Sequence, residues 1–187
     1  MSFVNGFAFQ SSTYIEKGPY KIITIKNVQD GDVCSHGASC VEQIPLRMSK
    51  ECELYVGDVL LSLTGNVGRV GIVYENNLLL NQRVAKIVPY DKIVLPLLYF
   101  WFRLPETKST MEMIAKGTAQ QNLSPIETLK LSIPFNQSSA IKLSKALKPL
   151  FDSIVSNLQQ NLYLSDLRDT LLPKLMSGEI DVSEVEI

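Results

Sequence analysis

Neutral hydrogen-bonding and cationic side chains recur in three polar loops of this sequence. Asn and Gln can pair with adenine edges and Arg with guanine, whereas Lys and Thr suit phosphates. The candidate DNA-contacting residues are Thr64, Asn66, Arg69, Asn81, Gln82, Arg83, Lys116, Thr118, Gln120 and Gln121. The composition of each loop alone is that of an ordinary turn. Their recurrence is what suggests a single polar recognition face.

Catalytic chemistry has little support among the residue types present. The one histidine, His36, lies in a Gly/Ser-rich stretch between Cys34 and Cys40, which is typical of an exposed loop. A zinc site from these residues and Cys52 is a weaker alternative, because the paired C-x2-C spacing is absent. No phosphate-binding G-x-x-x-x-G-K-[ST] loop occurs. We therefore expect a protein that is not an enzyme and that carries no cofactor or metal.

The bulk composition is globular but not basic. The 187 residues are 45% hydrophobic, and the net charge of −1 argues against holding nucleic acid by bulk charge alone. DNA affinity is then expected to be weak in the isolated chain or to need a partner. Three cysteines, no secretory signal and no apolar run of about 20 residues indicate a cytoplasmic protein without a membrane span.

The first 135 residues alternate short β-prone runs with turn residues. They predict strands at 20–25, 59–63, 69–74 and 84–88, with the second and third forming a hairpin. Helices are expected at 95–102 and 107–115, a helical turn from Ser124-Pro125, and extended chain at 129–133. The fold class is therefore α+β, a mixed sheet-rich domain followed by a long helix.

From residue 138 onward, leucines recur at steps of three and four, which predicts one long helix to residue 176. Pro149 predicts a kink or a restart, and Ser177-Gly178 ends the helix. A helix of this length with such an apolar stripe cannot stand alone in water, so we expect a helical partner, although packing on its own domain is the alternative. The predicted pairing residues are Leu147, Leu150, Ile154, Leu158, Leu162, Leu164 and Leu171.

Several sequence blocks, taken in order, resemble the specificity subunits of type I restriction–modification systems. They are Asn5-Gly6-Phe7-Ala8-Phe9, Ile25-Lys26-Asn27-Val28 with Asp30-Gly31, 57–65, Leu80-Asn81-Gln82-Arg83-Val84, 117–124 and 167–180. The resemblance implies a target-recognition domain with a spacer helix that pairs antiparallel with another. It implies double-stranded DNA as ligand, docking of adenine methyltransferase (modification) subunits, and through them the restriction subunit.

The resemblance also divides the chain into a target-recognition domain at 1–137, a spacer and dimerisation helix at 138–176, and a tail at 177–187. Members of the family hold two such units, so this chain would read one half-site, and a homodimer through the helix would rebuild the pair. A strand that usually precedes the Asn-Gly-Phe block is expected to be missing here, because Met1 lies only four residues before it. A truncated remnant, or an interaction module that does not read DNA, remains the alternative.

Overall fold

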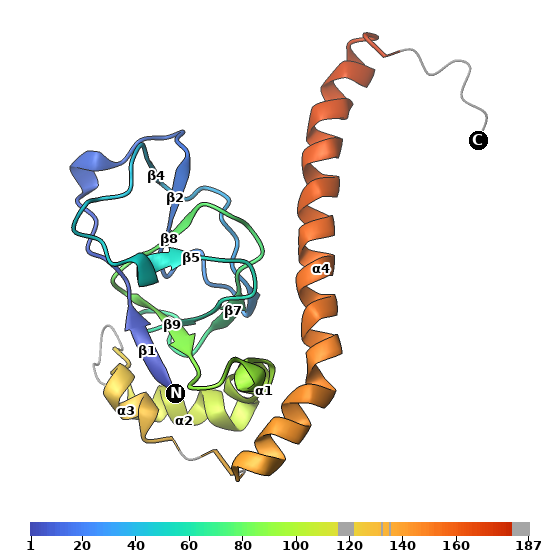
Figure 1. The fold of residues 1–187 in the computed structure, drawn as a ribbon. Coiled ribbons are helices and arrows are strands. Elements are labelled where there is room, and N and C mark those ends of the chain that lie inside the picture. The colour runs from blue at the N-terminus through green and yellow to red at the C-terminus, as the bar shows by residue number, and fades with distance from the viewer. Residues whose placement is uncertain (116–121, 132, 135, 181–187) are drawn as a thin grey trace.

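The computed structural model describes residues 1–115, 122–131, 133–134 and 136–180, and it consists of a two-sheet domain and a long helix (Figure 1). One sheet has five strands in the order β1 (Ser2–Asn5), β9 (Val84–Val88), β6 (Val59–Ser62), β7 (Val70–Ile72) and β3 (Gly31–Asp32). The other has four, in the order β4 (Cys40–Val41), β2 (Tyr20–Ile23), β8 (Leu78–Leu80) and β5 (Glu53–Leu54). The helices are α1 (Leu95–Phe102), α2 (Pro105–Ile114), α3 (Pro125–Leu129) and α4 (Gln137–Met176).

The four predicted strands appear as β2, β6, β7 and β9, and the hairpin is confirmed, since β6 and β7 pair antiparallel with Leu60 opposite Gly71. Strand β8 was not predicted. All three of its leucines are buried, so it lacks the alternation that marks a strand with one wet face. It pairs parallel with β2 and antiparallel with β5, which makes it an interior strand of its sheet.

Helix α1 is buried nearly all round, as its unbroken apolar sequence predicts. Tyr99 and Phe102 are 1% and 0% exposed, and they belong to a core cluster that also includes Met111 of α2 and Phe151 of α4. A second cluster fills the space around β2, β8 and the face of β6 that carries Leu60. The domain therefore has two adjoining cores, and α4 is attached to the first of them.

Two local expectations are wrong. The strand thought to be missing before Asn5 is present as β1, which pairs antiparallel with β9 over four residues. The extended segment expected at 129–133 is not formed in its described part, because Leu129 ends α3 and Lys130 closes a turn through its N–H to the Glu127 carbonyl. Ser124 occupies the N-cap of α3, but its side chain makes no capping hydrogen bond.

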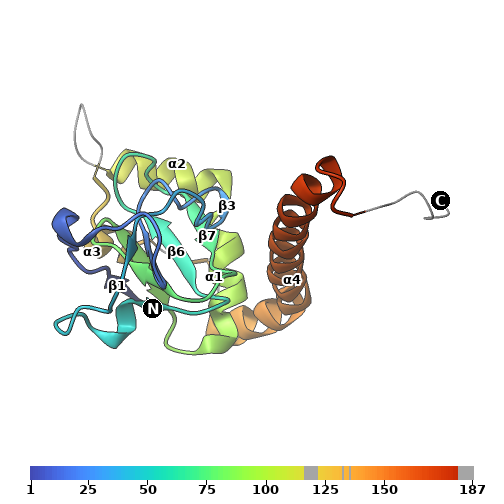
Figure 2. The same ribbon diagram turned by 90° about the horizontal axis from the view of Figure 1, so that it is seen from above.

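Helix α4 runs through Pro149 without a restart, which corrects one of the two alternatives expected there. The side chain of Asn136 caps its start by accepting from the Ser139 N–H at 2.8 Å, and Gly178 ends it with a φ of 74°. The first turns run beside α1 at the base of the domain, and the helix then bends away (Figure 1). Seen from above, its second half stands clear of the sheets (Figure 2). Nowhere in the described chain is a helix both long and apolar enough to span a membrane.

Candidate nucleic-acid interface

Several strand ends meet at one end of the domain and bring three polar loops together. The parallel strands β2 and β8 end there, β6 ends beside them, and β7 and β9 begin there. The loops at 24–30, 63–69 and 81–83 follow or precede these ends, and we call them together the loop end. Backbone hydrogen bonds connect them: Leu63 N–H donates to the Arg83 carbonyl at 3.2 Å, and Asn81 N–H donates to that of Ile23 at 3.1 Å. The loop end is therefore one surface.

The predicted DNA-contacting residues divide by exposure within this surface. Asn66, Gln82 and Arg83 are exposed, and Asn81 is half-buried. Thr64 is only 5% exposed, and its hydroxyl donates to Asn122 Oδ1 at 2.9 Å, which ties the 63–69 loop to the segment before α3. The remaining four candidates, Lys116, Thr118, Gln120 and Gln121, lie outside the described residues.

Arg69 is half-buried and held by a residue that the sequence did not single out. Its Nη1 donates to Gln29 Oε1 at 3.1 Å, and Gln29 Nε2 in turn donates to the Lys26 carbonyl at 2.7 Å. Lys26 is itself exposed. The loop end thus presents amide groups and cations side by side, which are the groups that read base edges and neutralise phosphates.

The 24–30 loop owes its shape to Asn27, which is 6% exposed. Its Oδ1 accepts from both the N–H and the hydroxyl of Thr24, at 3.0 and 2.8 Å, and its Nδ2 donates to the Cys34 carbonyl at 2.9 Å. The Asn27 side chain therefore acts as a loop brace and is not available to a ligand. This gives a structural role to the Asn of the Ile-Lys-Asn-Val block.

Asp30 anchors the same loop to the helical layer. Its carboxylate pairs with Arg103 at 3.3 Å and with Lys108 at 3.3 Å. Desolvation raises the pKa of Asp30, but the hydrogen bonds and charges of Lys108 and Arg103 outweigh it and hold the pKa below its usual value. Because Arg103 lies 73 residues from Asp30, sequence spacing gave no sign of this anchor.

The Asn-Gly-Phe block approaches the 81–83 loop so closely that only a glycine fits at position 6. A Cβ at position 6 would lie 2.2 Å from the Asn81 carbonyl oxygen, a distance that real Cβ contacts do not show. Around it, Phe7 N–H donates to the Leu80 carbonyl at 2.8 Å, and Gln82 N–H donates to that of Phe7 at 3.0 Å. The segment after β1 therefore fixes the position of Gln82.

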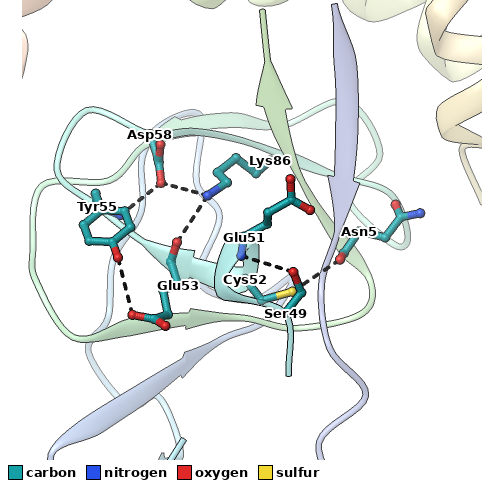
Figure 3. A network of polar contacts seen from close by, with 8 residues as sticks. All are labelled: Asn5, Ser49, Glu51, Cys52, Glu53, Tyr55, Asp58 and Lys86. Atoms are coloured by element: carbon teal, nitrogen blue, oxygen red, sulfur yellow. Dashed lines mark hydrogen bonds and ion pairs between the residues drawn. The ribbon is translucent and has the colours of Figure 1, made fainter. Parts of the chain in front are cut away.

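The opposite end of the domain holds a separate polar network (Figure 3). Lys86, with its side chain 11% exposed, pairs with Asp58 at 3.4 Å and donates to the Glu53 carbonyl at 3.2 Å. The Tyr55 N–H donates to the same Asp58 carboxylate at 3.0 Å. This network borders a hollow of about 970 Å³ between the domain and α4. It braces the 53–58 turn and lies away from the loop end.

The second half of α4 carries an apolar surface that the domain does not cover. Of the predicted pairing residues, Leu150 and Leu164 are each 57% exposed. Ile154 is partly buried against the core cluster that includes Phe151, so its side chain packs on the domain of the same chain. The other predicted positions, Leu147, Leu158, Leu162 and Leu171, are intermediate in exposure. The exposed set also includes Tyr163, Leu167, Leu172, Leu175 and Met176.

The described residues contain no group of three or more His, Cys, Asp or Glu side chains arranged to hold a metal ion. What they contain is a braced end of polar loops and a projecting helix with an uncovered apolar surface. These two features define a domain with one braced polar end, joined to a helical arm.

Comparison with known proteins identifies the family. Residues 2–163 match the family described as "Type I restriction modification DNA specificity domain". The chain is 26% identical over 172 residues to the type I restriction enzyme EcoBI specificity subunit of Escherichia coli, covering 88% of this chain and 36% of that protein. The chain therefore belongs to the family of type I restriction–modification specificity subunits, and it spans about a third of that curated relative.

Solved structures share the fold. The S subunit of the type I restriction–modification system of M. genitalium aligns with a TM-score of 0.60 at 19% identity, covering 94% of this chain and 43% of that one. A chain from a structure described as the basis of complex assembly and conformational transition of the type I system aligns with a TM-score of 0.53 at 17% identity, covering 92% and 42%. The chain thus corresponds to less than half of each.

Proposed function

We propose that this chain is a sequence-specific DNA-recognition unit of a type I restriction–modification system and that its loop end reads one half-site. The observation that carries the proposal is the joining of three separate loops into one surface that exposes Asn66, Gln82 and Arg83. Amide and guanidinium groups on adjacent loops can bond to adjacent base pairs in the major groove. The family described for residues 2–163 supports DNA as the ligand.

The exposed Lys26 and the half-buried Arg69 supply positive charge at the loop end, where the phosphates would lie. With a net charge of −1, the rest of the chain adds no long-range attraction for DNA. Binding by the isolated chain is therefore weak, and further phosphate contacts come from partner subunits. Modification subunits that carry adenine methyltransferase chemistry dock on this chain, which itself performs no catalysis, and a restriction subunit joins through them.

The arm α4 pairs with a second helix of the same kind. From Leu150 onward its exposed leucines reach as far as Leu175, a span of about 38 Å of helix at 1.5 Å per residue. An apolar surface of that length needs a cover in water. In this proposal a second copy supplies it and brings a second loop end to the neighbouring half-site.

The test of DNA reading compares variants of exposed loop-end residues. Arg83→Ala is expected to weaken binding to a selected duplex by roughly 1–3 kcal/mol and to relax base preference at one position, the usual effect of losing a bidentate base contact. Lys26→Ala is expected to weaken binding to all duplexes alike and to reduce the salt dependence. The control is Gln159→Ala on the exposed side of α4. If Arg83→Ala weakened binding to every duplex equally, Arg83 would contact the DNA backbone and not a base.

The test of pairing introduces charge into the uncovered surface. Leu164→Glu combined with Leu171→Glu should leave the domain folded and shift the chain to monomer in light scattering, because both residues lie beyond the part of α4 that packs on the domain. Gln159→Glu combined with Gln160→Glu adds the same two charges at exposed polar positions and should change nothing. A wild-type chain that stays monomeric at high concentration would refute the homodimer.

One observation favours a second candidate, an interaction module that does not read DNA: the pI of about 5.9 is acidic for a DNA-binding chain. In that case Arg83→Ala and Gln159→Ala would behave alike, and no duplex would be preferred over any other.

A further inference from the structure

Tyr99 touches both functional parts of the molecule, the loop end and the arm. It lies in the middle of α1 and is 1% exposed. Its ring meets Phe151 of α4 edge to face, with centroids 5.5 Å apart. Its hydroxyl donates to the Gly31 carbonyl at 3.1 Å, at the end of the 24–30 loop. One side chain thus connects a helix turn near residue 151 to a loop near residue 30.

Arg103, one turn after Tyr99, strengthens the connection to the loop. Its Nη1 donates to the Tyr99 hydroxyl at 2.7 Å, and its guanidinium lies 5.0 Å from the Tyr99 ring centroid. The same guanidinium pairs with the Asp30 carboxylate at 3.3 Å. The phenol therefore donates and accepts at once, and the loop is held at two adjacent residues. Burial raises the pKa of Tyr99, so its hydroxyl stays protonated at neutral pH and can donate the hydrogen bond to Gly31.

The arm is fixed firmly to α1 on the other side. Ser144 of α4 is 0% exposed, accepts from the Leu97 N–H at 3.2 Å and donates to the Ile93 carbonyl at 2.6 Å. Phe151, two turns later, is 6% exposed and belongs to the core cluster of α1. These contacts join α1 and the first turns of α4 into a single packed layer. Phe151 is the residue of this layer on α4 that contacts Tyr99.

The loop, by contrast, has few other attachments to the helices. Its own braces are Asn27 and the Gln29–Arg69 bond, which are local to the loop end. The Asp30 pairs to Arg103 and Lys108 involve a carboxylate that is 50% exposed, and such pairs contribute little on their own. Arg103 Nη2 also donates to the Asp30 carbonyl at 3.4 Å, in an exposed position. The part-buried hydrogen bond from the Tyr99 hydroxyl to Gly31 is thus the connection between loop and helices that water weakens least.

From these contacts we propose that Tyr99 is a positioning residue that couples the arm to the 24–30 loop and, through it, to the loop end. In this view Phe151, Tyr99 and the 29–31 segment form one packed path. Partner binding that changes the tilt of α4 shifts Phe151, and Tyr99 transmits the shift to the loop that holds Arg69 through Gln29. The role rests on the proposed function for its biological meaning, because the loop end is taken to read DNA. The physical coupling itself can be measured without DNA.

The experiment is native-state hydrogen exchange followed by mass spectrometry on the full chain and its variants. Tyr99→Phe removes only the hydroxyl and keeps the ring against Phe151. It should speed exchange of the amides at 27–33 by about tenfold, the effect of one to two ordinary hydrogen bonds. Amides of the β6–β7 hairpin should keep their rates. The matched control is Tyr163→Phe, which removes the hydroxyl of a tyrosine that is 66% exposed on α4.

Phe151→Leu tests the transmission, since Phe151 does not belong to the loop. It keeps an apolar side chain in the core but removes the edge-to-face contact with Tyr99. Loss of such a contact changes the equilibrium between the closed and locally open states by about two- to tenfold. Exchange at 27–33 should rise about threefold, and the double variant with Tyr99→Phe should show less than the product of the single effects.

Unchanged exchange at 27–33 in Tyr99→Phe would overturn the proposal. An equal acceleration of loop and hairpin amides in Phe151→Leu would also overturn it, because that pattern reports only lower global stability. A wild-type chain that selects no DNA sequence would refute the proposed function but would not alter the exchange pattern, so the two failures can be told apart.

Discussion

Gly6→Ala is the substitution whose effect follows most directly from the geometry of the loop end. The added Cβ would lie 2.2 Å from the Asn81 carbonyl oxygen and 2.5 Å from that of Leu80, where contacts under 3.0 Å are not tolerated. Both obstacles are backbone atoms, so no side chain can rotate away. The segment after β1 and the 81–83 loop must therefore separate by roughly 1 Å, the size of overlap that overpacked cores relieve by backbone shifts.

That separation breaks the hydrogen bonds between the two segments. Three are at risk: Gly6 N–H to the Val84 carbonyl at 3.3 Å, Phe7 N–H to Leu80 at 2.8 Å, and Gln82 N–H to Phe7 at 3.0 Å. Loss of two of them costs about 1–3 kcal/mol, and the residual strain adds about 1–3 kcal/mol. The free energy of unfolding should fall by about 2–6 kcal/mol, a large share of the roughly 5–15 kcal/mol of an ordinary domain.

Urea unfolding followed by circular dichroism measures the change, with Gly37→Ala as the control. A Cβ at position 37 meets nothing within 4 Å, so only its φ of 69° opposes the substitution, at a cost of about 1–2 kcal/mol. If Gly6→Ala cost no more than Gly37→Ala, the close approach of these two segments would be refuted.

Further predictions concern individual buried groups. Burial raises the pKa of Asp32 above its ordinary 3.8, so the ionised form of Asp32 is disfavoured in the folded state. The free energy of unfolding therefore falls as the pH rises from 3.8 through the raised pKa. Asp32→Asn should therefore stabilise the chain at pH 7 but not at pH 3, as thermal melts at the two pH values would show. Cys34 is half-buried whereas Cys40 and Cys52 are 5% and 4% exposed; a thiol reagent should therefore modify one cysteine quickly in the native chain and all three in urea, and three fast thiols would contradict the packing. Lys86→Met should lower the free energy of unfolding by roughly 1–2 kcal/mol, because it leaves Asp58 without its cation. Adding Asp58→Asn should recover part of that loss. If the two single changes in the free energy of unfolding added strictly in a double-mutant cycle, Lys86 and Asp58 would not interact.

The larger elements could be predicted because their sequences carry local signals. Short apolar, β-prone runs bounded by turn residues predicted β2, β6, β7 and β9, and an unbroken apolar run predicted buried α1. Strand β1 was missed because its four residues carry little local signal and are held by tertiary contacts, namely pairing with β9, 80 to 86 residues away, and packing of Phe3 against Phe102. The two-residue strands β3, β4 and β5 likewise depend on tertiary contacts, which no local pattern reveals.

The candidate site shows the same division. Residue types indicated polar loops, and chain order allowed a family resemblance, but sequence could not separate exposed side chains from braces. Thr64 looked like a phosphate contact, yet its hydroxyl is committed to Asn122. Tyr99 drew no attention because an aromatic residue in an apolar helix reads as core, and its bond to Gly31 joins residues 68 positions apart.

The central claim, that the loop end reads DNA, is tested most directly by selection from a pool of randomised duplexes. The chain would be used alone and again with a type I modification subunit, and the enriched sequences compared with those of Arg83→Ala. We predict a short motif that recurs inversely at a fixed spacing, as two paired copies require, and that loses one defined position in the variant. Absence of any enriched motif in either condition would contradict the account and favour a module that binds only protein partners.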